Sequence, residues 1–275
     1  KRHIASYRIC FSTRTWHQIL EGIEKMVWLM SRNKFMTPHI KLSFLVTFLA
    51  SCGLFEPDTG ISESYTFEST AIGATGVAAV YYPEDYTSST PVIYLLNGWG
   101  TDALAWETGI DLAMEAHKRD IMFVSLSAGS NLYMNNSSIP NKNYEDYVLE
   151  IVEGVENEYA LEVEHTHRAL CGMSNGGGGA IYLMSRYPNL FSACGSLSGT
   201  YYNQINFNNL RSHGIRIDVG TDDGVLRELQ RLHNKLTDDR ISHDYYEHAG
   251  DHDWDFWKKY CPDQFDFLEN WMSAD

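Results

Sequence analysis

The sequence predicts an α/β fold with a mostly parallel central sheet, helices on both faces and an opening antiparallel hairpin. Two observations carry this prediction. Short segments with strand character alternate along the chain with longer segments of helical periodicity, as in strands joined by crossover helices. One strand, residues 91–96, is a continuous apolar run, as expected for a strand covered on both faces, and residues 121–126 are predicted to form another buried strand. One globular domain with a sizeable core fits the length of the chain.

The elements follow from local pattern, taken in chain order. The hairpin is predicted from two strand-like segments with Gly73 and Gly76 between them. Later helices are placed where apolar residues recur every three or four positions, and strands where short apolar runs end in turn residues. Pro188 ends one helix and Pro262 interrupts the last, because proline lacks the backbone N–H that a helix interior needs. The predicted elements are strands 64–69, 76–82 and 91–96, helix 102–118, strand 121–126, helix 144–159, strand 168–172, helix 176–187, strands 191–197 and 215–220, helix 224–236, strand 243–247 and helix 253–272.

The charge of the chain limits its partners. The 275 residues carry a formal net charge of -15, and 44% of them are hydrophobic. The first 51 residues hold eight of the 21 Lys and Arg but two of the 36 Asp and Glu, which leaves about −21 from Cys52 onward. Such a body repels nucleic acid and anionic polymers. We therefore expect no nucleic-acid partner and a substrate that is neutral or weakly charged where it binds.

The N-terminal segment has the features of a bacterial lipoprotein signal. Basic residues precede an apolar run, residues 42–50, that is too short to span a bilayer. The run ends in Leu-Ala-Ser-Cys, which resembles a lipobox, so Cys52 is the expected lipidation site. We expect residues 1–51 to be upstream sequence and signal peptide, 52–63 a tether, and 64–275 the catalytic domain. The expected location is extracytoplasmic, at the outer membrane or cell surface, with the lipid anchor as the only membrane contact.

The remaining cysteines indicate neither a disulfide framework nor a zinc site. Beyond the N-terminal segment the sequence contains Cys171, Cys194 and Cys261, an odd number without short spacing. Two of them end apolar runs, where a buried thiol is the ordinary state. No metal or organic cofactor is expected.

The strongest chemical motif is a candidate nucleophile elbow. Gly172-Met173-Ser174-Asn175-Gly176 matches G-x-S-x-G, and it follows a predicted strand and opens a predicted helix. In an elbow the serine adopts a strained backbone conformation, and the flanking glycines avoid clashes of Cβ atoms. A glycine-rich turn that binds phosphate would need a basic residue nearby, and none is present. The pattern therefore predicts Ser174 as a nucleophile.

A nucleophilic serine needs a histidine base and a carboxylate that orients the base. In folds with this elbow the chain order is serine, acid, histidine. Asp222 and Asp223 both follow the strand 215–220, and position alone does not choose between them. His248 and His252 both fit the spacing for the base, and His252 is preferred because it lies nearest the following helix.

Two backbone N–H groups should stabilise the oxyanion of the tetrahedral intermediate. One is expected from Asn175, the residue after the nucleophile. The other is expected from Trp99, in the loop after strand 91–96, where Gly98 and Gly100 let the backbone turn inward. The Trp99 side chain can pack elsewhere, because the donor is main chain.

These motifs resemble the esterase D group of the α/β-hydrolases. The likeness lies in residues 95–98, 171–177, 220–223 and 250–257, and it extends over about residues 64–272. Relatives of this group include the first carbohydrate-esterase family, with its feruloyl and acetylxylan esterases, together with S-formylglutathione hydrolases, tributyrin-type esterases and mycolyltransferases. The resemblance implies the α/β-hydrolase fold.

The resemblance also selects residues. It implies Asp223 as the acid, from the G-T-x-D pattern, and His252 as the base, from the G-x-H-x-W/F pattern. Two positions depart from the family: Asn97 stands where histidine is usual, and Asn175 stands where methionine is usual. Both positions contribute backbone groups, so the departures affect the expected substrate class and leave the catalytic groups in place.

The expected function is hydrolysis of a carboxylic ester through an acyl-enzyme. Acetyl or feruloyl groups on polysaccharide are the favoured substrates, since an extracellular anchor suits a polymer that cannot enter the cell. An acyltransferase would use the same triad, and a non-catalytic binding protein on this scaffold would have lost a member of it. Aromatic residues expected at the rim of the site, where they could stack on sugar or phenolic rings, are Trp99, Trp106, Tyr133, Tyr201 and Tyr202.

Overall fold

The computed structural model describes residues 7–9, 55–57 and 60–273, and the chain divides into two compact units, residues 1–59 and 60–275. In the first unit, β1 (Tyr7–Ile9) and β2 (Phe55–Pro57) pair antiparallel. Cys52 and the predicted signal segment lie outside the described residues. The second unit begins with β3 at Gly60, so residues 60–63, expected in the tether, belong to a strand instead.

An eight-stranded sheet organises the second unit, in the order β10-β9-β8-β7-β5-β6-β4-β3. The antiparallel pairs are β3 with β4 and β4 with β6, and the other neighbours are parallel, which confirms the predicted architecture. The strands are β3 (Gly60–Ser69), β4 (Ala74–Pro83), β5 (Val92–Leu96), β6 (Met122–Leu126), β7 (Arg168–Met173), β8 (Ala193–Leu197), β9 (Gly214–Gly220) and β10 (Asp244–His248).

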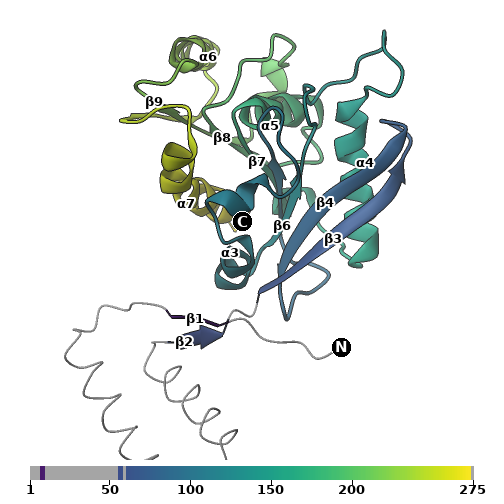
Figure 1. Cartoon of the computed structure of the whole chain (residues 1–275). Coiled ribbons are helices and arrows are strands. Elements are labelled where there is room, and N and C mark those ends of the chain that lie inside the picture. The colour runs from purple at the N-terminus through teal and green to yellow at the C-terminus, as the bar shows by residue number, and fades with distance from the viewer. Residues whose placement is uncertain (1–6, 10–54, 58–59, 274–275) are drawn as a thin grey trace, which may run out of the picture. The chain divides into compact units, whose positions relative to one another are not determined.

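Helices cover both faces of this sheet (Figure 1). Along β5, Tyr94 packs into one core with α4, α5 and α6, whereas Ile93 and Leu95 pack into the other with α3 and α7. Successive side chains of a strand point to opposite faces, so one short strand contributes to both cores. The helices are α3 (Leu112–Arg119), α4 (Tyr144–Glu158), α5 (Asn175–Arg186), α6 (Leu226–Asp238) and α7 (Trp254–Met272), with short 3₁₀ turns at Ala105–Thr108, His165–His167 and Phe207–Leu210. No helix within the described residues has both the length and the apolar character to cross a bilayer.

Two helix predictions were wrong. The predicted helix 102–118 is divided into the turn Ala105–Thr108 and the helix α3. The turn ends at Gly109, and α3 begins separately, with the Asp111 carboxylate accepting from Met114 N–H at 3.2 Å. The last helix, α7, runs through Pro262 without interruption. Proline removes one helical hydrogen bond, and the buried packing of Phe265 and its neighbours on α7 outweighs that loss.

Candidate active site

Ser174 occupies the sharp turn between β7 and α5. Its backbone has φ 54° and ψ −121°, a region that a residue with a side chain rarely adopts. Such a conformation costs on the order of 1–3 kcal/mol and persists only where surrounding structure enforces it. Here the Ser174 N–H donates to the Leu197 carbonyl at 2.8 Å, and the Ser174 carbonyl accepts from Thr200 N–H at 3.1 Å. The end of β8 and the loop after it therefore hold the serine in place.

The two glycines of the motif are required because neighbouring backbone atoms lie too close to leave room for a side chain. A Cβ atom added to Gly176 would lie 1.9 Å from the Leu96 carbonyl oxygen, at the end of β5. One added to Gly172 would lie 2.2 Å from the backbone of Gly176. The absence of side chains at both positions allows the first turn of α5 to pack directly on the ends of two central strands, which carries Ser174 to the edge of the sheet.

We expect Gly176→Ala to destabilise the protein by about 3 kcal/mol, since the colliding atom is backbone and cannot swing aside. Gly224→Ala is the matched control, because nothing lies within 4 Å of an added Cβ there. Urea unfolding of the two variants measures the difference. Equal midpoints for both would contradict this account of the turn.

The structure brings Ser174 together with His252 and Asp223. His252 Nε2 lies 2.8 Å from Ser174 Oγ, and His252 Nδ1 lies 3.0 Å from both carboxylate oxygens of Asp223. Asp223 follows β9, and His252 lies between β10 and α7, where its ring and that of Trp257 form a T-shaped pair with a centroid distance of 5.2 Å. Three loops, after β7, β9 and β10, thus converge on one point at the carboxyl ends of parallel strands.

The environment of Asp223 keeps it ionised. Burial by itself raises the pKa of this carboxyl, but hydrogen bonds with His252 and the Val225 N–H outweigh burial, and the net pKa lies below the ordinary value. A buried carboxylate hydrogen-bonded to Nδ1 fixes the ring orientation, stabilises a proton on that nitrogen and leaves Nε2 to accept one from Ser174.

The neighbouring candidates lie elsewhere. Asp222 is exposed, and its N–H donates to the Gly250 carbonyl at 3.0 Å. His248 Nε2 lies 2.7 Å from Asp218, a fully buried carboxylate on β9 that also accepts from Arg216 and Gln264. Sequence reasoning missed this second Asp–His pair, although a charged residue inside the apolar segment 215–220 was a usable signal for it.

The loop after β5 lies beside the nucleophile. A Cβ on Gly98 would be 3.6 Å from Ser174 Cβ. Asn97, at the position where the family usually has histidine, is buried, and its side chain donates to the Asp102 carbonyl at 2.7 Å and to Ser125 Oγ at 3.2 Å. Gly100 has φ 77°, a conformation that favours glycine, and its N–H donates to Gly129. These contacts fix the backbone around Trp99.

Buried tyrosines join this loop to the start of α5. Tyr133 donates to the Asn97 carbonyl at 3.0 Å, and Tyr202 donates to Asn175 Oδ1 at 2.8 Å. The Asn175 side chain donates in turn to the Asn131 carbonyl at 2.9 Å. Asn175 therefore positions the segments on either side of Ser174, a role that sequence reasoning missed.

The predicted aromatic rim was partly wrong. Trp106, Tyr133 and Tyr202 are buried. Only Trp99, with 57% of its surface exposed, and Tyr201, with 36%, remain accessible. Tyr133 and Tyr202 can be buried because the hydroxyl group of each makes hydrogen bonds inside the protein.

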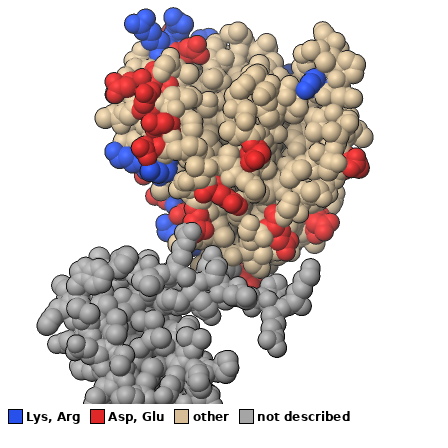
Figure 2. Space-filling view, in the orientation of Figure 1, with Lys and Arg blue, Asp and Glu red and all other residues tan. Residues whose placement is uncertain are grey.

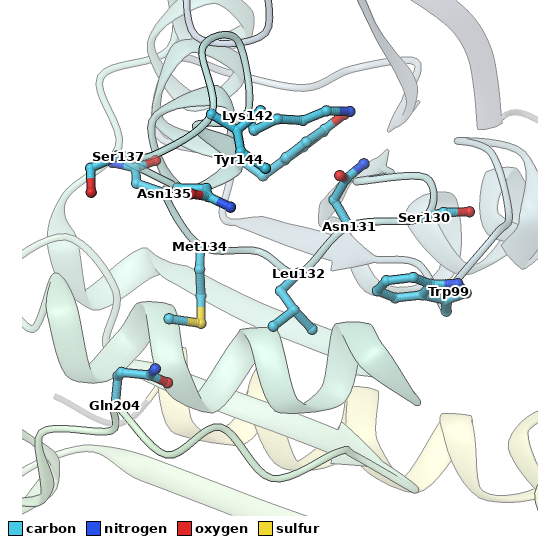
Figure 3. A pocket seen from close by; sticks show the side chains of 12 residues that line it. Trp99, Ser130, Asn131, Leu132, Met134, Asn135, Ser137, Lys142, Tyr144 and Gln204 are labelled. Atoms are coloured by element: carbon cyan, nitrogen blue, oxygen red, sulfur yellow. The ribbon is translucent and has the colours of Figure 1, made fainter.

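A cavity of about 390 Å³ opens directly on Ser174. A second of about 410 Å³ adjoins it, and the two share Trp99, Leu132, Met134 and Gln204 (Figure 3). In Figure 2, charged side chains gather along one side of the described domain, and further acidic side chains are scattered over the rest of that face. The first cavity is lined by Trp99, Leu132, Met134, Ser174, Asn175, Thr200, Tyr201, Tyr202, Asn203 and Gln204.

The cysteines stand apart from this chemistry. Cys171, Cys194 and Cys261 are buried and unpaired, as predicted for the first two, and burial raises the pKa of each thiol. Among the residues that the structure describes, no group of three or more His, Cys, Asp or Glu side chains could hold a metal ion.

The chain is similar in sequence to known esterases. The model of the Esterase family, described as “Putative esterase”, matches residues 69–268. The chain is 30% identical over 144 residues to Esterase Rv1288 of Mycobacterium tuberculosis, a match that covers 49% of this chain and 31% of that protein. It is 24% identical over 225 residues to an acetyl esterase of Caldicellulosiruptor saccharolyticus, covering 66% of this chain and 82% of the relative. The matched region spans about a third of the mycobacterial relative.

A solved structure of a ferulic acid esterase shares the fold. It superposes with a TM-score of 0.69 at 20% sequence identity, covering 78% of this chain and 99% of that protein. The predicted α/β-hydrolase fold is thereby confirmed.

Proposed function

Because the chain belongs to the Esterase family, whose model matches most of its length, we propose that Ser174 is the nucleophile through which it hydrolyses carboxylic esters. One observation carries the proposal. A serine in a strained strand-to-helix turn is joined to a histidine at 2.8 Å, and that histidine is joined to a buried carboxylate at 3.0 Å. This is the constellation that activates a hydroxyl for acyl transfer.

In the first half-reaction, Ser174 Oγ attacks the carbonyl carbon while His252 Nε2 takes the hydroxyl proton. Asp223 stabilises the imidazolium without accepting its proton. The N–H groups of Trp99 and Asn175 donate to the oxyanion. Removing one donor of such a pair typically lowers turnover by about 10²–10³-fold.

Collapse of the tetrahedral intermediate breaks the bond to the alcohol oxygen, which takes the proton from His252. The acyl group is then held on Ser174. In the second half-reaction, a water molecule gives a proton to His252 and attacks the acyl carbon. Collapse returns the proton to Ser174 and releases the carboxylic acid.

The proposed substrates are acetyl or feruloyl esters of polysaccharide. Two similar proteins, named as an acetyl esterase and a ferulic acid esterase, support the acyl groups. The exposed ring of Trp99 beside Ser174 offers a surface on which a sugar or phenolic ring can stack.

We expect residues 53–275 to hydrolyse p-nitrophenyl acetate and to release acetate or ferulate from acylated xylan. A chromogenic ester panel run beside acetylated and feruloylated xylan measures both. Activity on the chromogenic esters without release from either xylan would exclude the polysaccharide and keep the esterase. Inactivity on every ester would contradict the proposed function.

The location proposed for this enzyme is outside the cytoplasm, held by lipid on Cys52. The lipobox-like sequence before Cys52 supports this. Two or three acyl chains give stable anchoring where one does not. We expect a fatty-acid analogue to label the wild-type protein, and Cys52→Ala to release it unlabelled into the medium. An unlabelled wild-type protein would refute the anchor.

A further inference from the structure

The second cavity extends the surface that begins at Ser174. It shares four lining residues with the cavity that contains the nucleophile, so a substrate lying in one can continue into the other (Figure 3). Its outer part is built by the segment that joins β6 to α4, including Asn131, Asn135, Ser137 and Lys142.

Most of the polar side chains that line this cavity are uncharged. Within the described part of the chain, the side chains of Ser130, Ser137 and Gln204 line the cavity without a hydrogen bond to the protein. Amide and hydroxyl groups with unused capacity beside an exposed indole, here Trp99, suit a sugar, which offers hydroxyl groups at its edges and C–H bonds on its faces.

Charge in the cavity has the opposite sign to the protein as a whole. Among the described residues, no Asp or Glu lines either cavity, although acidic residues far outnumber basic ones from Cys52 onward. Lys142 is the one basic residue that lines either of them in the part of the chain that the structure describes. Its side chain is half-buried, with the ammonium 5.7 Å from the centre of the Tyr144 ring, and it makes no ion pair with any described carboxylate.

A cation confined beside an aromatic ring, with no carboxylate partner, is a ready site for an anion. Figure 3 shows the side chains of Lys142 and Tyr144 extending in the same direction, toward the side of the pocket that Asn131 borders. The ammonium is thus presented together with the polar groups suited to sugar hydroxyls.

We propose that this second cavity binds a carboxylate-bearing sugar, a uronate, on the alcohol side of the ester, with Lys142 as the specificity-determining residue. The proposal rests on the proposed esterase function, in which the alcohol side is the sugar polymer. Lys142 donates to the uronate carboxylate, Trp99 packs against the sugar ring, and Ser130, Ser137 and Gln204 bind its hydroxyl groups.

The test uses a pair of acetylated xylo-oligosaccharides that carry glucuronate or glucose as a branch at the same position. Wild-type enzyme should prefer the glucuronate substrate about tenfold in kcat/KM, the scale of one charge-assisted hydrogen bond. Lys142→Gln should lower this preference to about one, and Lys142→Arg should retain most of it. The ratio is taken within each variant, so partial loss of folded enzyme cancels.

Lys259→Gln is the matched control. Lys259 also lies over a tyrosine ring, 5.0 Å from the centre of Tyr260, but lines neither cavity, so its removal should leave the preference unchanged. A wild-type ratio at or below one, or a Lys142→Gln variant that keeps the preference, would overturn the inference. Failure of the wild type on p-nitrophenyl acetate, which carries no sugar, would instead count against the proposed function.

Discussion

Ser174→Ala should reduce turnover of p-nitrophenyl acetate by about 10⁴-fold or more while leaving the protein folded. The substitution removes only the hydroxyl that lies 2.8 Å from His252 Nε2. Its backbone hydrogen bonds to Leu197 and Thr200 remain, so the turn keeps its shape. Steady-state kinetics give kcat, and thermal unfolding of the same preparation shows that the fold is retained.

Ser89→Ala is a suitable control for this experiment. Ser89 is exposed, bonds only to Thr87 through its side chain, and lines neither of the cavities at the nucleophile. Its variant should hydrolyse the ester at the wild-type rate. Near-normal turnover by Ser174→Ala would end the assignment of Ser174.

The second large effect concerns the acid and the base. Asp223→Asn and His252→Ala should each lower turnover by about 10⁴-fold, because loss of the orienting carboxylate favours the wrong histidine tautomer and loss of histidine removes the base. The adjacent Asp222→Asn is the matched control, since that carboxylate is exposed and its backbone contact survives the change. Its turnover should change only modestly.

His248→Ala separates the two Asp–His pairs. We expect a modest change in turnover but lower stability, because the fully buried Asp218 loses a partner at 2.7 Å and keeps Arg216 and Gln264. The opposite result would be an inactive Asp222→Asn variant together with an active Asp223→Asn variant. That result would overturn the choice of acid while leaving the esterase itself in place.

Most of the fold could be predicted from local pattern, because the central strands are short apolar runs that only a doubly covered sheet can bury. The failures arose where tertiary contacts decide. Pro262 is tolerated inside α7 because the apolar face of that helix packs along the sheet. The break between residues 105–108 and α3 depends on a local cap at Asp111, which the apolar spacing of 102–118 concealed.

Part of the candidate site could also be predicted from local pattern, and part could not. The elbow pattern located Ser174, but position alone left Asp222 and Asp223 open, since consecutive residues that leave a strand differ only in direction. The structure supplies that direction, with Asp223 facing His252 and Asp222 facing solvent.

The charge of the whole chain says little about the charge at the site. The charge of about −21 from Cys52 onward predicts a neutral or weakly charged substrate. A total charge cannot show that, among the described residues, no Asp or Glu lines the two cavities beside Ser174. Lys142 lies far from the nucleophile in sequence and belongs to no motif. Only the folded arrangement of the segment between β6 and α4 brings it to the cavity that adjoins the site.

The central claim is that Ser174 carries the acyl group, and trapping that intermediate tests it most directly. Wild-type enzyme mixed with p-nitrophenyl acetate, quenched in acid within the first turnover and digested, should yield one acetylated peptide, with the acetyl group on Ser174 by tandem mass spectrometry. His252→Ala and Ser174→Ala should yield none above background. An acetyl group on another residue of the active wild-type enzyme, or an equal yield from Ser174→Ala, would contradict the account.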